Sequence, residues 1–140
     1  MRRLVFLGDL IDRGASSAGV LRLWARNAAA WNVDRNDRVI GNHEQLLLLA
    51  MTDAPHKEKA TNMWLSEAIG GSTFFKEMME LPFLYSRRLD FKLFSQSLGA
   101  EILHLFTTQR TQVPTGNLIL VHAGLDPARD RVDFLSQPWT

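Results

Sequence analysis

The sequence of 140 residues contains no cysteine. Disulfide bonds, thiolate metal sites and cysteine nucleophiles are therefore excluded. A surplus of charge of one sign is also missing, since 16 Lys and Arg stand against 15 Asp and Glu, which gives a formal net charge of +1. So small an excess gives no reason to expect binding to the phosphate backbone of DNA or RNA. We expect no nucleic-acid partner.

Long apolar runs are missing as well. The longest, Leu46 to Met51, is far below the roughly 20 residues that a membrane span needs. The apolar stretch after Arg2-Arg3 is too short for the core of a signal peptide. We therefore expect a cytoplasmic protein without a membrane partner. The hydrophobic share of 46% and the charged share of 22% are ordinary for a globular chain of one domain.

Short apolar runs alternate with helical periodicity in the first part of the chain. Leu4 to Leu7 and Val39-Ile40 each predict a short strand that ends in polar residues. Ser16 or Ser17 can cap a helix that is expected to run to about residue 30. The pattern of residues 44–52 predicts the next helix. The order strand, helix, strand, helix indicates a parallel sheet with helical crossovers, which is an α/β fold.

Residues from about 53 to 112 carry helical periodicity and little strand pattern. We expect four helices there, at about residues 60–69, 73–81, 91–98 and 100–108. Leu118 to Val121 then predicts a third strand of the sheet. The fold class expected is α/β, with parallel strands, helical crossovers and one helical insertion.

Polar residues follow each of the three expected strands. Ligands of open α/β sheets bind outside the carboxyl ends of the strands, so these polar side chains are expected at one edge. Carboxylate, amide and imidazole groups together suit divalent cations. Arginine offers a planar fork for phosphate oxygens, and a histidine held by a carboxylate can protonate a leaving alkoxide. The residues are Asp9, Asp12 and Arg13 after the first strand, Asn42 and His43 after the second, and His122 after the third.

Structural alternatives exist for several of these residues. Asp12-Arg13-Gly14 has the composition of a turn with a local ion pair. Glu44 is either a first-turn helix carboxylate or a hydrogen-bond acceptor behind the site. Trp24 and Trp64 fall on apolar helix faces and are expected in the core. Arg87-Arg88 is expected to be a solvated pair.

Three segments, in this order, resemble motifs of the calcineurin-like metallophosphoesterases, in the branch of the phosphoprotein phosphatases. They are GDLIDRG at Gly8–Gly14, GNHE at Gly41–Glu44 and HAGLDP at His122–Pro127. This branch includes bacterial Ser/Thr protein phosphatases and diadenosine tetraphosphate hydrolases. The resemblance implies two divalent metal ions, such as Mn²⁺, Fe or Zn²⁺, and a metal-bridging hydroxide that attacks phosphorus in line.

The resemblance also implies roles for individual residues. Asp9 corresponds to the aspartate that bridges the two metals, and Asn42 and His122 correspond to ligands of the second metal. His43 corresponds to the general acid, Asp12 to the aspartate that orients it, and Arg13 to a phosphate-binding arginine. Gly14 and Gly41 are expected to allow backbone geometry with positive φ.

Two parts of the family pattern are not matched by these 140 residues. No residues before Leu4 match the earlier GD-x-HG motif, and none after the HAG segment match the further histidine ligand. We therefore expect residues 1–140 to form a single partial metallophosphoesterase domain, with the helical insertion at about 53–112.

The expected function is a metal-dependent phosphoester hydrolase that resembles a Ser/Thr protein phosphatase, with a phosphorylated protein or a nucleotide as substrate. One alternative is a hydrolase of dinucleoside polyphosphates, which shares these motifs. The other is a truncated, non-catalytic chain, for which we expect little phosphatase activity even with added manganese. The sequence does not indicate the oligomeric state.

Overall fold

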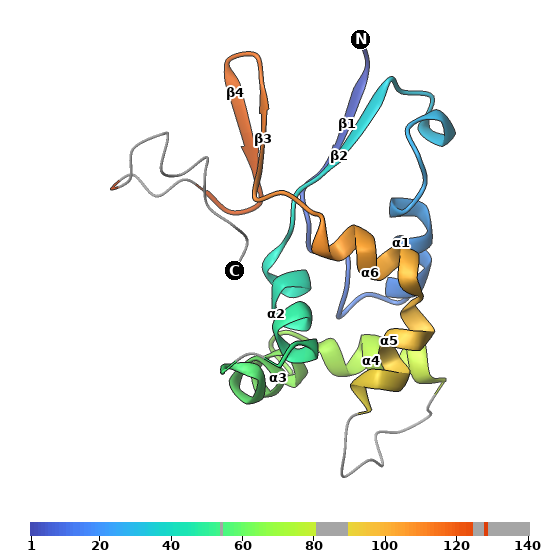
Figure 1. Ribbon diagram of the computed structural model, residues 1–140, viewed down its shortest axis with the longest axis vertical. Coiled ribbons are helices and arrows are strands. Elements are labelled where there is room, and N and C mark those ends of the chain that lie inside the picture. The colour runs from blue at the N-terminus through green and yellow to red at the C-terminus, as the bar shows by residue number, and fades with distance from the viewer. Residues whose placement is uncertain (54, 81–89, 125–127, 129–140) are drawn as a thin grey trace.

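The computed structural model describes residues 1–53, 55–80, 90–124 and 128. Within these ranges the chain forms six α-helices, a 3-10 helix and two two-stranded sheets. Figure 1 shows the two sheets at one end of the molecule and most of the helices at the other. The mixture of helix and strand agrees with the coarse α/β class predicted from the sequence.

Strands β1 (Arg3–Phe6) and β2 (Arg35–Arg38) pair in parallel. Helix α1 (Ser17–Trp24) lies in the connection between them, as the crossover prediction requires. The prediction that Val39-Ile40 forms the second strand was wrong, because the ladder lies just before it in a segment of charged residues without an apolar run. Val39 instead makes an isolated parallel bridge to Arg110.

Strand β4 (Leu118–Val121) has the predicted bounds but not the predicted partner. It pairs antiparallel with β3 (Gln112–Thr115), so it is not a third strand of the parallel sheet. The turn between them contains Gly116 at a φ of 54°, and glycine is favoured in such short hairpin turns because it tolerates positive φ. Strand β3 was not predicted because it contains Pro114 and polar residues and therefore has no apolar run.

The helices in the described ranges agree with the prediction in number, α5 also agrees in its bounds, and the others differ from it at their ends. Helix α1 stops at Trp24 rather than near residue 30, and a 3-10 helix at Ala29–Trp31 follows it. Ser16 caps α1, since its Oγ accepts a hydrogen bond from the Gly19 amide at 3.1 Å. The remaining helices are α2 (Asn42–Met51), α3 (Lys57–Leu65), α4 (Gly71–Met79), α5 (Phe91–Leu98) and α6 (Ala100–Thr107).

Aromatic side chains make up much of the core between the helices. Phe75 of α4 stacks on Phe94 of α5 with 5.1 Å between the ring centroids, and Phe94 also meets the edge of Trp64 from α3. Such ring pairs contribute about 0.5–1.5 kcal/mol each beyond the burial of their area. Because these contacts fix α3 against α4 and α5, the position of Trp64 is set by the core.

No helix in the described ranges has the length and apolar character that a membrane crossing needs.

Candidate active site

The loop after β1 has a backbone of unusual conformation. Gly8 has a φ of 83°, and the non-glycine residues Asp9, Asp12 and Arg13 have φ values of 54°, 71° and 46°. Left-handed conformations of this kind are unfavourable for residues that carry a Cβ, and they persist where the surroundings hold them. The strain is concentrated in the segment that carries three of the predicted site residues.

Glu44 holds this loop in place. Its side chain is fully buried on α2, and its carboxylate accepts hydrogen bonds from the amides of Asp9 at 2.8 Å and Leu10 at 2.7 Å. The same carboxylate accepts from the amide of Gly41 at 3.0 Å. Both interpretations that the sequence left open therefore hold, because Glu44 is a first-turn carboxylate that accepts from the N-cap amide of α2 and also accepts from the loop after β1.

The glycines of the two motifs act differently from the prediction. Gly41 has a φ of −94°, so it does not need the left-handed region, and Gly14 is not among the residues with positive φ. A Cβ at Gly41 would overlap Asp9, and a Cβ at Gly8 would overlap the backbone of Gly41. Close approach of two strand ends, rather than positive φ, is the requirement at Gly41.

Asp9, Asn42 and His122 come together from three separate elements. Asp9 lies in the loop after β1, Asn42 is the first residue of α2, and His122 follows β4. His122 Nε2 lies 3.3 Å from Asp9 Oδ2 and 3.0 Å from Asn42 Oδ1. The convergence expected from the carboxyl ends of the strands is therefore present, although β4 belongs to a different sheet.

The other ring nitrogen of His122 fixes the chemistry of this cluster. His122 Nδ1 lies 2.6 Å from the carbonyl oxygen of Leu7, which can only accept, so Nδ1 carries the proton. In the neutral ring Nε2 then presents a lone pair, and it faces the oxygens of Asp9 and Asn42, which are acceptors too. With a neutral ring, three acceptor atoms thus meet without a donor between them, which is an arrangement that a cation satisfies. A protonated ring would instead donate from Nε2 to Asp9 and Asn42.

Asp12 and His43 form a buried pair next to this cluster. His43 Nδ1 lies 2.8 Å from Asp12 Oδ2, and the indole Nε1 of Trp64 donates to both oxygens of Asp12, at 3.0 and 3.1 Å. Burial raises the pKa of Asp12 to about 6, and the hydrogen bonds from His43 and Trp64 oppose that rise. Asp12 therefore accepts from two rings and fixes the orientation of His43.

Arg13 and Asp9 face the outer nitrogen of His43. Arg13 Nη2 lies 3.1 Å from His43 Nε2, and Asp9 Oδ2 lies 4.0 Å from the same atom. Since a guanidinium group can only donate, Nε2 of His43 accepts in this arrangement and carries no proton. All six residues predicted for the site thus lie in one connected group.

Comparison with known proteins gives no assignment. No family model, curated protein or solved structure matches the chain. Any function must therefore be argued from the chemistry of the site. Within the described part of the chain, no group of three or more His, Cys, Asp and Glu side chains is placed to hold a metal ion. The cluster at His122 includes only two such residues, Asp9 and His122. Its third candidate metal ligand is the amide oxygen of Asn42.

Trp64 is the site residue that the sequence analysis missed. It was predicted in the core, and it is fully buried there, but its indole N–H also reaches Asp12. A Cβ at Gly71 would overlap the Trp64 ring, so the first residue of α4 must be small for the indole to fit. The clue in the sequence is chemical, because a buried tryptophan usually has a hydrogen-bond acceptor for its N–H. Arg87-Arg88 and Asp126-Pro127 lie outside the described residues.

Substituting Asp12 with Asn is expected to raise the melting temperature of the metal-free chain at pH 8. Because the pKa of Asp12 in the folded chain lies above its ordinary value of 3.8, its contribution to stability is present below that value and is lost as the pH rises through about 6. Asn does not ionise, and it can still bond to Trp64 and His43. Thermal unfolding in EDTA measures the effect, and the gain should vanish below about pH 4.

The matched control is Asp53→Asn. The Asp53 side chain is exposed, and a hydrogen bond from Lys57 lowers its pKa, so no gain in melting temperature is expected at pH 8. A lower melting temperature for Asp12→Asn at pH 8, or a gain that persists under acidic conditions, would show that charge burial at Asp12 does not limit stability.

Proposed function

We propose that this chain carries the site of a metal-dependent phosphoester hydrolase. The observation that carries the proposal is the meeting of three acceptor atoms, from Asp9, Asn42 and His122, beside a histidine that is oriented by a buried aspartate. A cation site and a proton-transferring histidine are the two elements that hydrolysis of a phosphoester needs. The order of the three motifs along the chain supports the same conclusion.

The distances between the candidate metal ligands fit a divalent ion. Two ligands with bonds of about 2.1 Å lie about 3 Å apart when they are at right angles around an ion, and the distances from His122 Nε2 are 3.0 and 3.3 Å. Asp9, Asn42 and His122 would hold the ion, and imidazole with two oxygens suits Mn²⁺, Fe or Zn²⁺. A bound ion supplies Lewis-acid polarisation of a phosphoryl oxygen and activation of water.

Arg13 and His43 would act on the substrate. The Arg13 guanidinium offers a fork for two oxygens of a phosphoryl group, and it now donates to His43 Nε2. When a phosphoryl group takes over that guanidinium, Nε2 is released and can carry a proton. Asp12 keeps the ring in the tautomer with a proton on Nδ1, and Nε2 then faces the leaving oxygen as general acid.

The test is hydrolysis of p-nitrophenyl phosphate with and without Mn²⁺, followed by assays on a phosphopeptide and on diadenosine tetraphosphate. The proposal predicts turnover that depends on the metal and is lost in Asp9→Asn, whereas Asp53→Asn, an exposed change of the same kind, keeps it. Turnover that survives Asp9→Asn would refute the assignment of the site. Metal binding without turnover on any of the three substrates would favour the non-catalytic alternative.

A further inference from the structure

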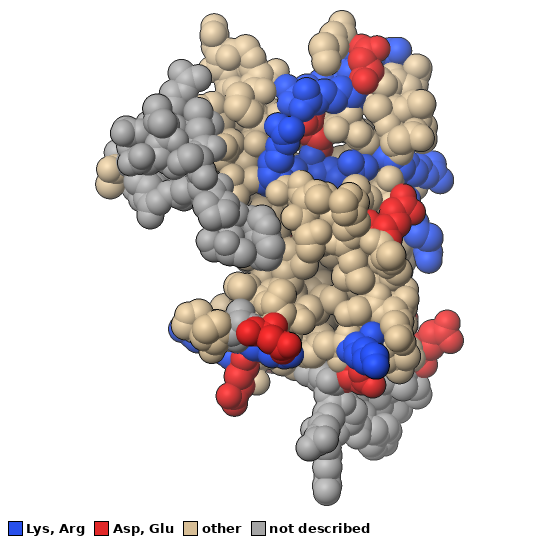
Figure 2. Space-filling model, in the orientation of Figure 1, with Lys and Arg blue, Asp and Glu red and all other residues tan. Residues whose placement is uncertain are grey.

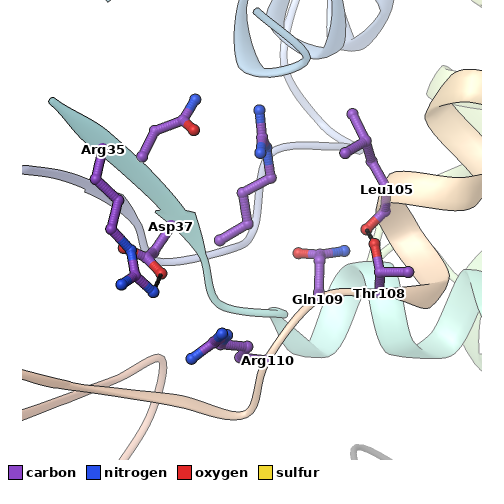
Figure 3. A pocket seen from close by; sticks show the side chains of 8 residues that line it. Arg35, Asp37, Leu105, Thr108, Gln109 and Arg110 are labelled. Atoms are coloured by element: carbon purple, nitrogen blue, oxygen red, sulfur yellow. Dashed lines mark hydrogen bonds and ion pairs between the residues drawn. The ribbon is translucent and has the colours of Figure 1, made fainter. Parts of the chain in front are cut away.

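A hollow lies between β2 and the end of α6, and none of its residues belongs to the candidate active site. It has a volume of about 250 Å³ and is lined by residues 35–38 and by Leu105, Thr108, Gln109 and Arg110. Figure 3 shows Arg35 and Asp37 on β2 on one side of the hollow and Thr108 and Gln109 on the other. Figure 2 shows Lys and Arg side chains gathered on this face of the molecule, in its upper half.

The charge of the hollow is positive, although that of the whole chain is close to neutral. Arg35, Arg38 and Arg110 line it, with Asp37 as the one carboxylate. Asp37 is already satisfied, because its oxygens lie 2.7 Å from Arg35 Nη2 and 2.7 Å from Nε of Arg3, which comes from β1. The excess of guanidinium over carboxylate groups therefore remains available to an anion.

Two of these guanidinium groups are suited to a ligand. Arg38 donates through Nε and Nη2 to the carbonyl of Trp24, at 3.2 and 2.9 Å, and through Nη2 to the carbonyl of Arg26 at 3.0 Å, so its Nη1 is the group left for a ligand among the described residues. Its charge lies 5.1 Å from the Trp24 ring centroid. Burial lowers the pKa of Arg38, and the carboxylates of Asp37 and Glu101 oppose that effect. The Arg110 side chain is exposed and has no ion-pair partner in the part of the chain that the structure describes.

Gln109 supplies an independent observation. It is 6% exposed, and its Oε1 is buried without a hydrogen-bond partner in the described residues. Its Nε2 donates to the carbonyl of Phe106 at 3.4 Å, so turning the amide over would bring two oxygens together. A buried acceptor of this kind is costly unless a donor reaches it. A ligand that fills the hollow is therefore expected to carry a hydrogen-bond donor for Gln109 Oε1.

We propose that this hollow binds a small organic phosphate that carries a free hydroxyl group, such as a pentose phosphate. A phosphate monoester carries about −1.5 to −2 charges at pH 7, which matches the excess of arginine over carboxylate. Its oxygens bind the guanidinium groups of Arg38 and Arg110, and its hydroxyl donates to Gln109 Oε1. The inference does not depend on the proposed hydrolase activity.

The test is calorimetric titration of the chain with ribose 5-phosphate, in EDTA to exclude binding through a metal. We expect saturable binding that weakens about tenfold or more in Arg110→Ala, since a charge-assisted hydrogen bond contributes that much. In Gln109→Leu we expect loss of the preference for ribose 5-phosphate over inorganic phosphate. Arg22→Ala on α1 removes the same charge outside the hollow and should bind as the unchanged chain does.

Arg13→Ala separates this hollow from the candidate active site. Binding that is lost in Arg13→Ala and kept in Arg110→Ala would overturn the inference, because the phosphate would then occupy the active site. Absence of binding at millimolar ribose 5-phosphate, in a chain whose thermal unfolding shows that it is folded, would overturn it as well. Equal binding of inorganic phosphate and ribose 5-phosphate by the unchanged chain would refute the role of Gln109.

Discussion

Replacing His43 with Asn is expected to lower kcat by about 100- to 10,000-fold, the usual contribution of general acid–base catalysis, and to leave metal affinity unchanged. The reason is geometric, because Nδ1 of His43 is held by Asp12 at 2.8 Å and Nε2 faces Arg13. Asn preserves a polar contact to Asp12, but it has no group that can deliver a proton from the position of Nε2. Steady-state kinetics on p-nitrophenyl phosphate and direct metal analysis measure the two quantities.

The outcome separates two roles for His43. It lies next in sequence to Asn42, and its Nε2 is 4.0 Å from Asp9 Oδ2, so a ligand role is the competing interpretation. Loss of the metal in His43→Asn, with kcat falling in proportion, would contradict proton transfer and make His43 a ligand. His104→Asn is the control, since His104 is exposed on α6 and should change neither quantity.

Replacing Trp64 with Phe is expected to lower kcat by about 10- to 100-fold, as the loss of a supporting hydrogen bond behind a site does, with little change in KM. Phe keeps a buried ring but removes the N–H that donates to both oxygens of Asp12. This hydrogen bond helps to lower the pKa of Asp12 against the effect of burial, so its loss should raise that pKa further. The ionisation of Asp12 should therefore appear at higher pH in the pH profile of kcat.

The chain offers a matched control for this substitution. Trp24 is also buried, at 1% exposure, but its indole N–H has no hydrogen-bond partner among the described residues. Trp24→Phe thus removes a similar ring volume without breaking a hydrogen bond, and its pH profile should stay where it is. Equal shifts in both variants would mean that Trp64 acts through packing alone, and an unchanged profile in Trp64→Phe would remove it from the site.

The sequence predicted those elements whose hydrophobic pattern is local. The apolar run at Leu118–Val121 gave β4 its bounds, and the periodicity of Phe91–Leu98 gave α5. Strand β2 was not predicted because it consists of charged and polar residues, of which Asp37 pairs across the sheet with Arg3 of β1. The pairing of β4 with β3 is local, but it was not predicted because Pro114 and its polar neighbours give β3 no apolar alternation.

The proximity of the candidate site residues was predicted further than the fold, because it needs only the ends of the strands. Asp9, Asn42 and His122 meet even though β4 lies outside the parallel sheet. Contacts that depend on packing were not predictable, and the hydrogen bond from Trp64 to Asp12 joins residues on α3 and on the loop after β1. Glu44 lies between these cases, since its motif was visible but its three amide partners were not.

The central claim is a cation site at Asp9, Asn42 and His122. The most direct measurement is a titration with Mn²⁺, in which the free ion is monitored by electron paramagnetic resonance. The account predicts saturable binding that weakens by at least about tenfold in His122→Ala, because a ligand that lies between Asp9 and Asn42 is lost. His56→Ala, at an exposed histidine, should bind as the unchanged chain does. Equal binding by the unchanged chain and His122→Ala, or no saturable binding at all, would contradict a cation site at these residues.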